Sequence, residues 1–139
     1  MKIVIYLPGI FETNEDGYEQ IDLSEVASLD DAAYEEILVG DCLDFIEHRD
    51  EFLKELVKKL RYGGKIIVAG ADIYEISRAI MNRNLSLEEI NSTIYDGRYS
   101  ISSVFDMTRK IQKLGLKPTH KRANDFKYTI IAERPTPDG

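Results

Sequence analysis

The chain has 139 residues, one cysteine and a formal net charge of −7 at pH 7, and 43% of its residues are hydrophobic. This length and composition fit one domain, residues 1–139, with enough apolar side chains for a core. They exclude a membrane-spanning helix, because no run approaches the roughly 18 apolar residues that such a helix needs. The first residues show no secretion signal, and Cys42 has no intrachain disulfide partner, so we expect a cytoplasmic protein.

Charge is distributed unevenly along the chain. Residues 1–50 hold 14 Asp and Glu against only Lys2 and Arg49, whereas residues 51–139 hold 16 Lys and Arg against 11 acids. An acidic first third repels phosphates, so we expect no nucleic acid partner. Both charged blocks are best interpreted as solvated surfaces.

The first part of the chain predicts short strands. Two apolar runs, at residues 2–7 and 36–39, have strand length, and residues 18–23 can form a further short strand between them. Pro8 and Gly9 end the first run. Ser28 or Asp30 would cap a short helical turn over residues 31–34, before the third strand.

The middle of the chain predicts the central strand of a sheet. Apolar residues recur at helical spacing from Leu43 to Leu60, and Gly63 and Gly64 are then expected to close this helix. Lys65–Ala69 follows as a run that is apolar on both faces, which is typical of a parallel strand with helices on either side.

The last part predicts helices followed by a hairpin. Helical patterns cover residues 73–83, 87–94 after a capping box that starts at Ser86, and a segment that begins at Ser100–Ser103 and ends at Gly115. Two extended runs, 116–122 and 126–133, are separated by only three residues, which allows only an antiparallel hairpin. The predicted class is therefore α/β, with a Rossmann-like, mostly parallel sheet, helices on both faces and a C-terminal antiparallel hairpin.

Several segments, taken in the order of the chain, resemble segments of the class I S-adenosylmethionine-dependent methyltransferase superfamily. Leu60–Val68 is similar to that family's "L-x-P-G-G-hydrophobic" passage, with Tyr62 where proline is usual. Phe105–Pro118 is similar to its helix-leucine-glycine entry to the terminal hairpin, and Tyr128–Pro135 to its closing strand. An antiparallel last strand beside a parallel sheet separates this family from other Rossmann-like folds.

The resemblance implies a cofactor site at the carboxyl ends of the strands. It implies S-adenosylmethionine as cofactor, with Gly9 under the methionine moiety, Asp22 accepting hydrogen bonds from ribose hydroxyls, and Asp41 facing the methyl group. The acceptor would be a small molecule or glycan of unknown identity. From the residues alone, Asp22 and Asp41 are equally consistent with turn or N-cap positions at strand exits.

The other reactive side chains are weaker candidates for a functional site. Cys42 is expected to be a small buried side chain, because no histidine neighbours it in sequence. His48 and His120 have no companion at metal-ligand spacing, so no metal site is expected. Arg98 and Tyr99, together with Tyr95, lie in a predicted loop that either covers a substrate or is ordinary surface. The sequence identifies no catalytic residue.

A second hypothesis remains open. Where the family has an acidic-x-G-x-G loop, the segment 6–11 keeps only Gly9, and Ile10 and Phe11 add bulk. The chain would then be a methyltransferase-like interaction or structural module without cofactor. An exposed sheet edge or apolar crevice would favour a homodimer.

Overall fold

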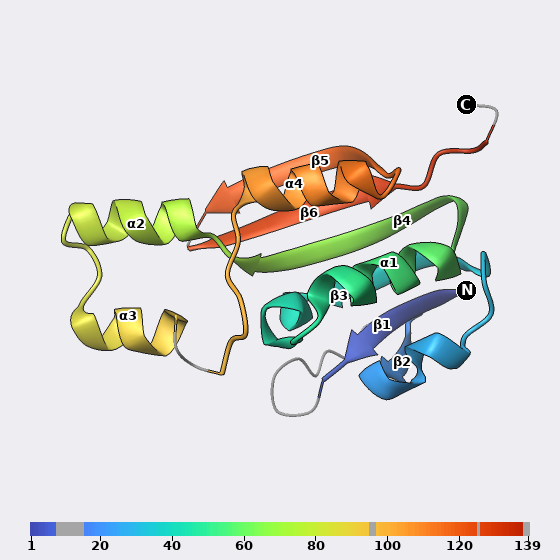
Figure 1. Ribbon diagram of the computed structural model, residues 1–139, viewed down its shortest axis with the longest axis horizontal. Coiled ribbons are helices and arrows are strands. Elements are labelled where there is room, and N and C mark those ends of the chain that lie inside the picture. The colour runs from blue at the N-terminus through green and yellow to red at the C-terminus, as the bar shows by residue number, and fades with distance from the viewer. Residues whose placement is uncertain (8–15, 95–96, 125, 138–139) are drawn as a thin grey trace.

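The computed structural model of the chain describes residues 1–7, 16–94, 97–124 and 126–137 (Figure 1). Its strands form one six-stranded sheet in the spatial order β2-β1-β3-β4-β6-β5. The strands are β1 (Lys2–Tyr6), β2 (Glu19–Asp22), β3 (Tyr34–Gly40), β4 (Leu60–Ala71), β5 (Lys117–Asn124) and β6 (Lys127–Glu133). β1 is parallel to β2 and β3, and β3 to β4, whereas β6 is antiparallel to both of its neighbours, β4 and β5. The predicted α/β class and terminal hairpin are confirmed.

Helices occupy the connections between these strands. They are the 3₁₀ helices η1 (Leu23–Ser28) and η2 (Asp41–Phe45), and the α-helices α1 (Arg49–Lys59), α2 (Ile73–Met81), α3 (Leu87–Ile94) and α4 (Val104–Lys113). No helix within the described ranges is long and apolar enough to cross a membrane.

The predicted starts of α3 and α4 are confirmed. Ser86 Oγ accepts a hydrogen bond from the Glu89 amide at 3.2 Å, and Glu89 Oε1 accepts one from the Ser86 amide at 3.3 Å. This reciprocal pair is the capping box that the sequence indicates. Ser103 caps α4, since its hydroxyl accepts a hydrogen bond from the Asp106 amide at 3.1 Å.

The double glycine does not end a helix, as the sequence had suggested. α1 ends at Lys59, and Leu60 is already extended and paired with Tyr34 of β3. Gly63 and Gly64 lie inside β4, where Gly63 has a φ of +82° and its amide donates to the Arg134 carbonyl at 2.6 Å. The left-handed conformation that favours glycine is used here for an irregularity in a strand.

The predicted helical turn over residues 31–34 is wrong. The short helix lies earlier, at η1, and Tyr34 already begins β3. The amides of Ala32 and Ala33 donate to the carbonyls of Lys58 and Lys59, at 2.8 and 3.0 Å. They therefore satisfy the last carbonyls of α1, which a helix end leaves without partners.

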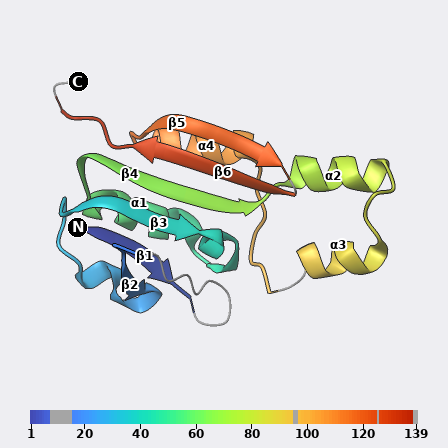
Figure 2. The same ribbon diagram turned by 180° about the vertical axis from the view of Figure 1, so that it is seen from behind.

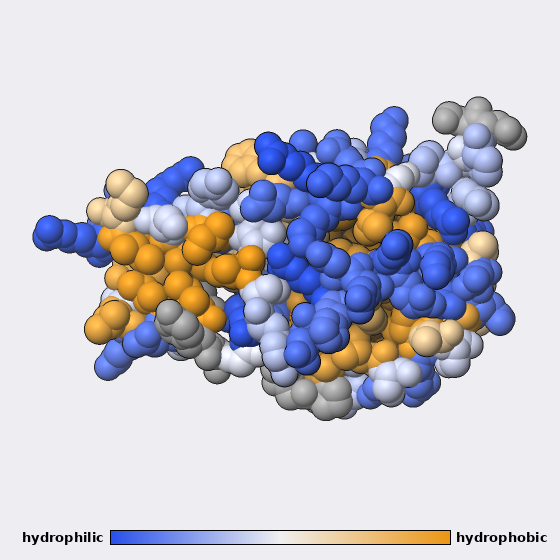
Figure 3. Space-filling model, in the orientation of Figure 1, coloured by the Kyte–Doolittle hydropathy of each residue, from blue (hydrophilic) through white to orange (hydrophobic). Residues whose placement is uncertain are grey.

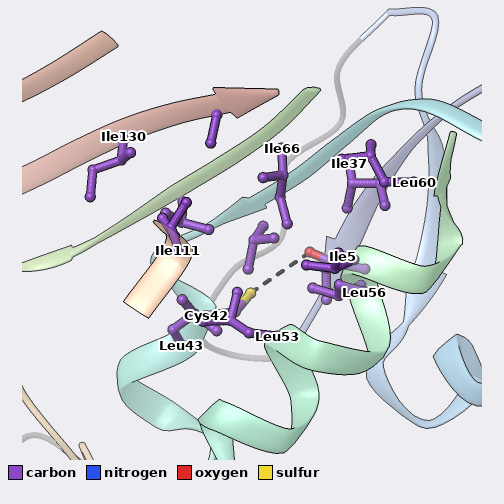
Figure 4. Close-up of a cluster of buried hydrophobic side chains, with 14 of the residues drawn as sticks. Ile5, Ile37, Cys42, Leu43, Leu53, Leu56, Leu60, Ile66, Ile111 and Ile130 are labelled. Carbon is purple, nitrogen blue, oxygen red and sulfur yellow. Dashed lines mark hydrogen bonds between the residues drawn. The ribbon is translucent and has the colours of Figure 1, made fainter. Parts of the chain in front are cut away.

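The main core lies on one face of the sheet. α1 and α4 lie in front of the strands in Figure 1 and behind them in Figure 2, where the chain is seen from the other side. Figure 4 shows strand side chains such as Ile66 and Ile130 beside Leu53 and Leu56 of α1 and Ile111 of α4. All five of these side chains are 0–1% exposed.

The helices of the described chain are distributed unevenly over the two faces of the sheet. In the described residues, no helix covers the side of the sheet that faces the viewer in Figure 2. The connection from β2 to β3 contains only the 3₁₀ helix η1, and the α-helices belong to the later connections. We call the side with α1 and α4 the front face and the other side the rear face.

α2 and α3 extend beyond the end of β4 and form a smaller cluster of their own. Its buried members are Ala71, Ile76, Ala79 and Leu85. In the view of Figure 3, hydrophobic residues gather over this part of the surface. Met81 and Leu87, at 82% and 74% exposed, are among the most exposed large apolar side chains described.

Candidate functional site

The strand directions bring the predicted site residues to one edge of the sheet. β1, β2, β3 and β4 are parallel, so their carboxyl ends share an edge, which in open α/β sheets is the usual place for a ligand. Asp22 is the last residue of β2, Asp41 directly follows β3, and Asp72 directly follows β4. Gly9, with Pro8, Ile10 and Phe11, lies outside the described residues.

Asp22 combines a capping role with a carboxylate oxygen that other groups can use. It lies beside Tyr6 at the end of β1, and its Oδ1 accepts hydrogen bonds from the amide and hydroxyl of Ser24, at 2.9 and 2.7 Å. These bonds, first the one from the backbone amide, lower the pKa of Asp22. The carboxylate is therefore charged at neutral pH, and within the described chain Oδ2 receives no hydrogen bond.

Asp41 forms an ion pair across the strand ends. Its Oδ2 lies 3.0 Å from the Nζ of Lys127, the first residue of β6. β6 begins at this edge because it runs opposite to β4. The antiparallel strand thus delivers a cation to the edge where the parallel strands end, and it holds the Asp41 carboxylate in place.

Asp72 is structural and not a free site residue. Its Oδ1 accepts hydrogen bonds from the amides of Tyr74 and Glu75, and its Oδ2 accepts one from the amide of Val104 at 2.9 Å. One buried carboxylate therefore caps α2 and holds the start of α4.

Cys42 is a core side chain, as predicted. It is 0% exposed, and its Sγ lies 3.8 Å from the carbonyl oxygen of Ile5. Burial, with a further contribution from Asp41, raises the pKa of the Cys42 thiol to about 12. A thiol that stays protonated at neutral pH is not a nucleophile.

The sequence analysis missed Asp44, which is the most buried acid of this edge. Its Oδ2 accepts hydrogen bonds from the Ala71 amide at 2.9 Å and from Arg98 Nε at 3.1 Å, and its carbonyl accepts the Tyr99 amide at 2.7 Å. Burial raises the pKa of Asp44 despite these bonds. The available signal was a single acid inside the otherwise apolar run 42–46.

Asp44 fixes the segment that follows α3 onto the end of the sheet. Arg98 is 15% exposed and also stacks over the Phe45 ring, with 4.9 Å between its guanidinium carbon and the ring centroid. Tyr99 is bound through its backbone, while 65% of the residue remains exposed. Of the predicted loop, Arg98 therefore serves structure and Tyr99 is available at the surface. Tyr95 lies outside the described residues.

A small group of polar atoms surrounds Gly70 near the end of β4. Asp44 Oδ1 and Tyr128 Oη are both buried, and neither has a hydrogen-bond partner in the described chain. A Cβ added to Gly70 would lie 2.8 Å from the first and 2.9 Å from the second. Glycine is therefore required at this position, because any side chain would collide with these oxygens.

No protein-family model and no curated protein matches the sequence. Solved structures do match in fold. A SAM-dependent methyltransferase from Methanosarcina mazei matches with a TM-score of 0.64 and 12% identity, over 93% of this chain and 73% of that one. A Thermotoga maritima protein, described as a SAM-dependent methyltransferase and possible histamine N-methyltransferase, matches with a TM-score of 0.61 and 15% identity, over 84% of this chain.

Some of these structures are much longer than this chain. An O-methyltransferase family protein from Burkholderia thailandensis matches with a TM-score of 0.60 and 15% identity over 86% of this chain, which spans 36% of that protein. The chain spans 63% of the Thermotoga protein. Such low identity shows the fold alone: the chain has a class I S-adenosylmethionine-dependent methyltransferase-like fold.

Proposed function

We propose that this chain binds S-adenosylmethionine at the carboxyl edge of β1, β2 and β3 and transfers its methyl group to a small-molecule or glycan acceptor. The observation that carries the proposal is the strand arrangement, with β6 antiparallel between β4 and β5. This arrangement is part of a fold match to solved methyltransferases that covers most of the chain. A cofactor-free module is not favoured by these neighbours.

Asp22 is the residue whose chemistry best fits the cofactor. A charged carboxylate at the end of β2, with one oxygen available, can accept hydrogen bonds from the two hydroxyls of a ribose. We propose Asp41 on the side of the methyl group, held by Lys127, and Gly9 under the methionine moiety. The ion pair leaves Asp41 with one of its two oxygens engaged.

Methyl transfer depends more on the positioning of the acceptor than on reactive side chains of the protein. The cofactor supplies a methyl group that is already activated on a sulfonium, so the protein has to align the acceptor with it and exclude other geometries. The exposed Tyr99, on the segment fixed by Asp44, is placed at this end of the sheet. The Thermotoga neighbour is described as a possible histamine N-methyltransferase, which supports small amines as the first compounds to test.

Cofactor binding can be measured directly by calorimetry and by thermal unfolding. A ligand that binds only the folded state stabilises it by about 2.7 kcal/mol at a concentration 100 times its Kd. We expect heat on titration with S-adenosylmethionine and a higher unfolding temperature. If millimolar cofactor produces neither, the proposal is wrong and the chain is a cofactor-free module.

A pair of variants tests the role of Asp22. Asp22→Asn keeps a side chain that caps η1 well but removes the charge. Because a hydrogen bond to a charged group contributes about 1.5–3 kcal/mol, we expect the Kd for the cofactor to rise at least about tenfold. Glu25→Gln, an exposed acid in the same short helix, makes the same change in net charge and should leave the Kd unchanged. Equal effects of the two variants would contradict a specific contact at Asp22.

A further inference from the structure

A continuous apolar row crosses the rear face of the sheet. The strand registers align one residue from each strand, which are in order Gln20, Val4, Leu38, Ile67, Ile131 and His120. The four central members are aliphatic, and the two outer members are polar. Ala69 and Thr129 form the next pair on the same face. An apolar centre with polar borders is the general plan of a protein interface.

Three of the four central side chains are less covered than their neighbours in sequence, whereas Val4 is 0% exposed. Leu38, Ile67 and Ile131 are half-buried, whereas the residue before each of them, on the front face, is fully buried. The rear face carries no helix in the described chain, as Figure 2 shows. Parallel sheets are found almost only with both faces covered, because both faces are apolar. The rear face therefore has the character of a surface that another layer covers.

We propose that a second copy of this chain covers the rear face, so that two sheets pack face to face in a symmetric dimer. The size of the face fits this arrangement. Six strands spaced by about 4.8 Å and seven residues of about 3.3 Å each give a plan area of roughly 650 Å². The roughness of side chains increases the area that is buried. A standard stable interface buries about 800 Å² on each partner, so the face is close to the size that is needed.

Charges on the rear face distinguish the symmetric arrangements. By register, the half formed by β1, β2 and β3 carries Asp22 and the ion pair of Lys2 with Glu36, and the other half carries Glu133 and three basic residues. On the basic half of the rear face, Lys65, Lys117 and Arg122 form no ion pair within the described ranges. A two-fold axis parallel to the strands places β5 of one copy opposite β2 of the other, and so opposes unlike charges.

The same axis also brings the apolar residues together. The axis passes between β3 and β4, the two central strands. Leu38 of one copy then faces Ile67 of the other, and the relation is reciprocal. A two-fold axis perpendicular to the strands would instead oppose basic half to basic half. The geometry thus selects one of the two dimers that the flat face allows.

The test is the mass of the full chain in solution, by light scattering and sedimentation from about 1 to 100 µM. We expect a dimer for the unaltered chain and a monomer for Ile67→Lys, because a charge would enter the centre of the interface. The matched control is Met81→Lys, which changes an exposed apolar residue on α2 and should leave the dimer intact. A monomer throughout for the unaltered chain overturns the proposal. A dimer that resists Ile67→Lys, or that only Met81→Lys dissociates, also overturns it.

A second variant covers the case in which Ile67→Lys fails to fold. Arg122→Glu changes an exposed residue at the edge of the sheet, and circular dichroism should show an intact fold. It should raise the dimer dissociation constant at least tenfold, and added salt should raise the constant of the unaltered chain. If the dissociation constant stays the same in both measurements, the proposed arrangement is contradicted. These readouts do not depend on S-adenosylmethionine, so they can fail or succeed independently of the proposed function.

Discussion

Ile66 and Ile67 are identical side chains, adjacent on β4, and they have opposite surroundings. Ile66 is 0% exposed beneath α1 and α4, whereas Ile67 is half-buried on the rear face. The neighbouring strands repeat this difference, at Ile37 and Leu38 and at Ile130 and Ile131. The two faces therefore have the same kind of side chain but different partners. The front face is covered by α1 and α4, and no helix of the described chain covers the rear face.

The largest expected difference is in the free energy of unfolding after truncation on each face. Ile66→Ala should lower it by about 2–5 kcal/mol, the usual range for a cavity in a core. Ile67→Ala should lower it by about 1 kcal/mol or less when the protein is dilute, because its side chain is already partly hydrated. Urea unfolding at low micromolar concentration measures both. Equal losses would contradict the difference between the faces.

Protein concentration sharpens this comparison. If the rear face is an interface, the loss caused by Ile67→Ala should grow as the concentration rises, because dimerisation stabilises the folded state by mass action. The loss caused by Ile66→Ala should change less. A loss at Ile67 that does not depend on concentration would argue against burial of that residue in a dimer.

Adding volume to β4 should give the next largest difference. Gly70→Ala would place a Cβ within 2.9 Å of two buried oxygens on the front face, so we expect a loss of about 1–3 kcal/mol. Ala69→Val adds more volume one residue earlier, but on the open rear face, and should change stability by about 0.5 kcal/mol or less. Thermal and urea unfolding of the two variants provide the comparison. A harmless Gly70→Ala would contradict the close packing around Asp44 and Tyr128.

The smallest expected effect is a pH dependence that comes from Asp44. Burial raises the pKa of Asp44 in the folded state, although Arg98 and Arg49 oppose the shift. The folded chain then binds a proton that the unfolded chain has already lost, so this residue lowers stability as pH rises from about 4 through the folded pKa. The Asp44→Asn variant lacks this titrating carboxyl group and therefore lacks this contribution to the pH dependence.

The measurement compares the unfolding free energies of the unaltered chain and Asp44→Asn between pH 4 and pH 7. The stability of the unaltered chain relative to the variant should fall as pH rises and then become constant. Groups whose pKa is lowered, such as Asp22 and Asp31, contribute equally to both proteins and cancel in the difference. A difference that rises with pH would show that the hydrogen bonds to Asp44 outweigh its burial.

Sequence reasoning found the elements whose signals are local. The capping box at Ser86 and Glu89 and the N-cap at Ser103 involve residues three positions apart, so the sequence contains both partners. The hairpin of β5 and β6 follows from a link too short for any other connection. The resemblance to methyltransferases rested on the order of such segments, and the solved structures confirm it as a fold.

Predictions failed where a distant partner changes the meaning of a local pattern. Gly63 and Gly64 have the sequence pattern of a helix end. They lie in a strand because the Gly63 amide donates to the Arg134 carbonyl and Leu60 pairs with Tyr34. In the sequence, Asp44 is one more acid of the acidic first third. In the structure it is buried, and it accepts hydrogen bonds from the Ala71 amide and from Arg98, which fixes the segment that follows α3. In both cases the partner residues are distant in sequence from the residues that they contact.

The sequence by itself determined most of the strand and helix segments, the charge contrast between the two halves, and the order of segments that resembles a methyltransferase. It did so because periodicity, caps and turn lengths act over a few residues. Only the tertiary structure decided that one face of the sheet carries α1 and α4 and that Lys127 reaches Asp41. A run that is aliphatic on both faces can bury either face equally well, so the choice depends on where distant helices and the antiparallel strand pack.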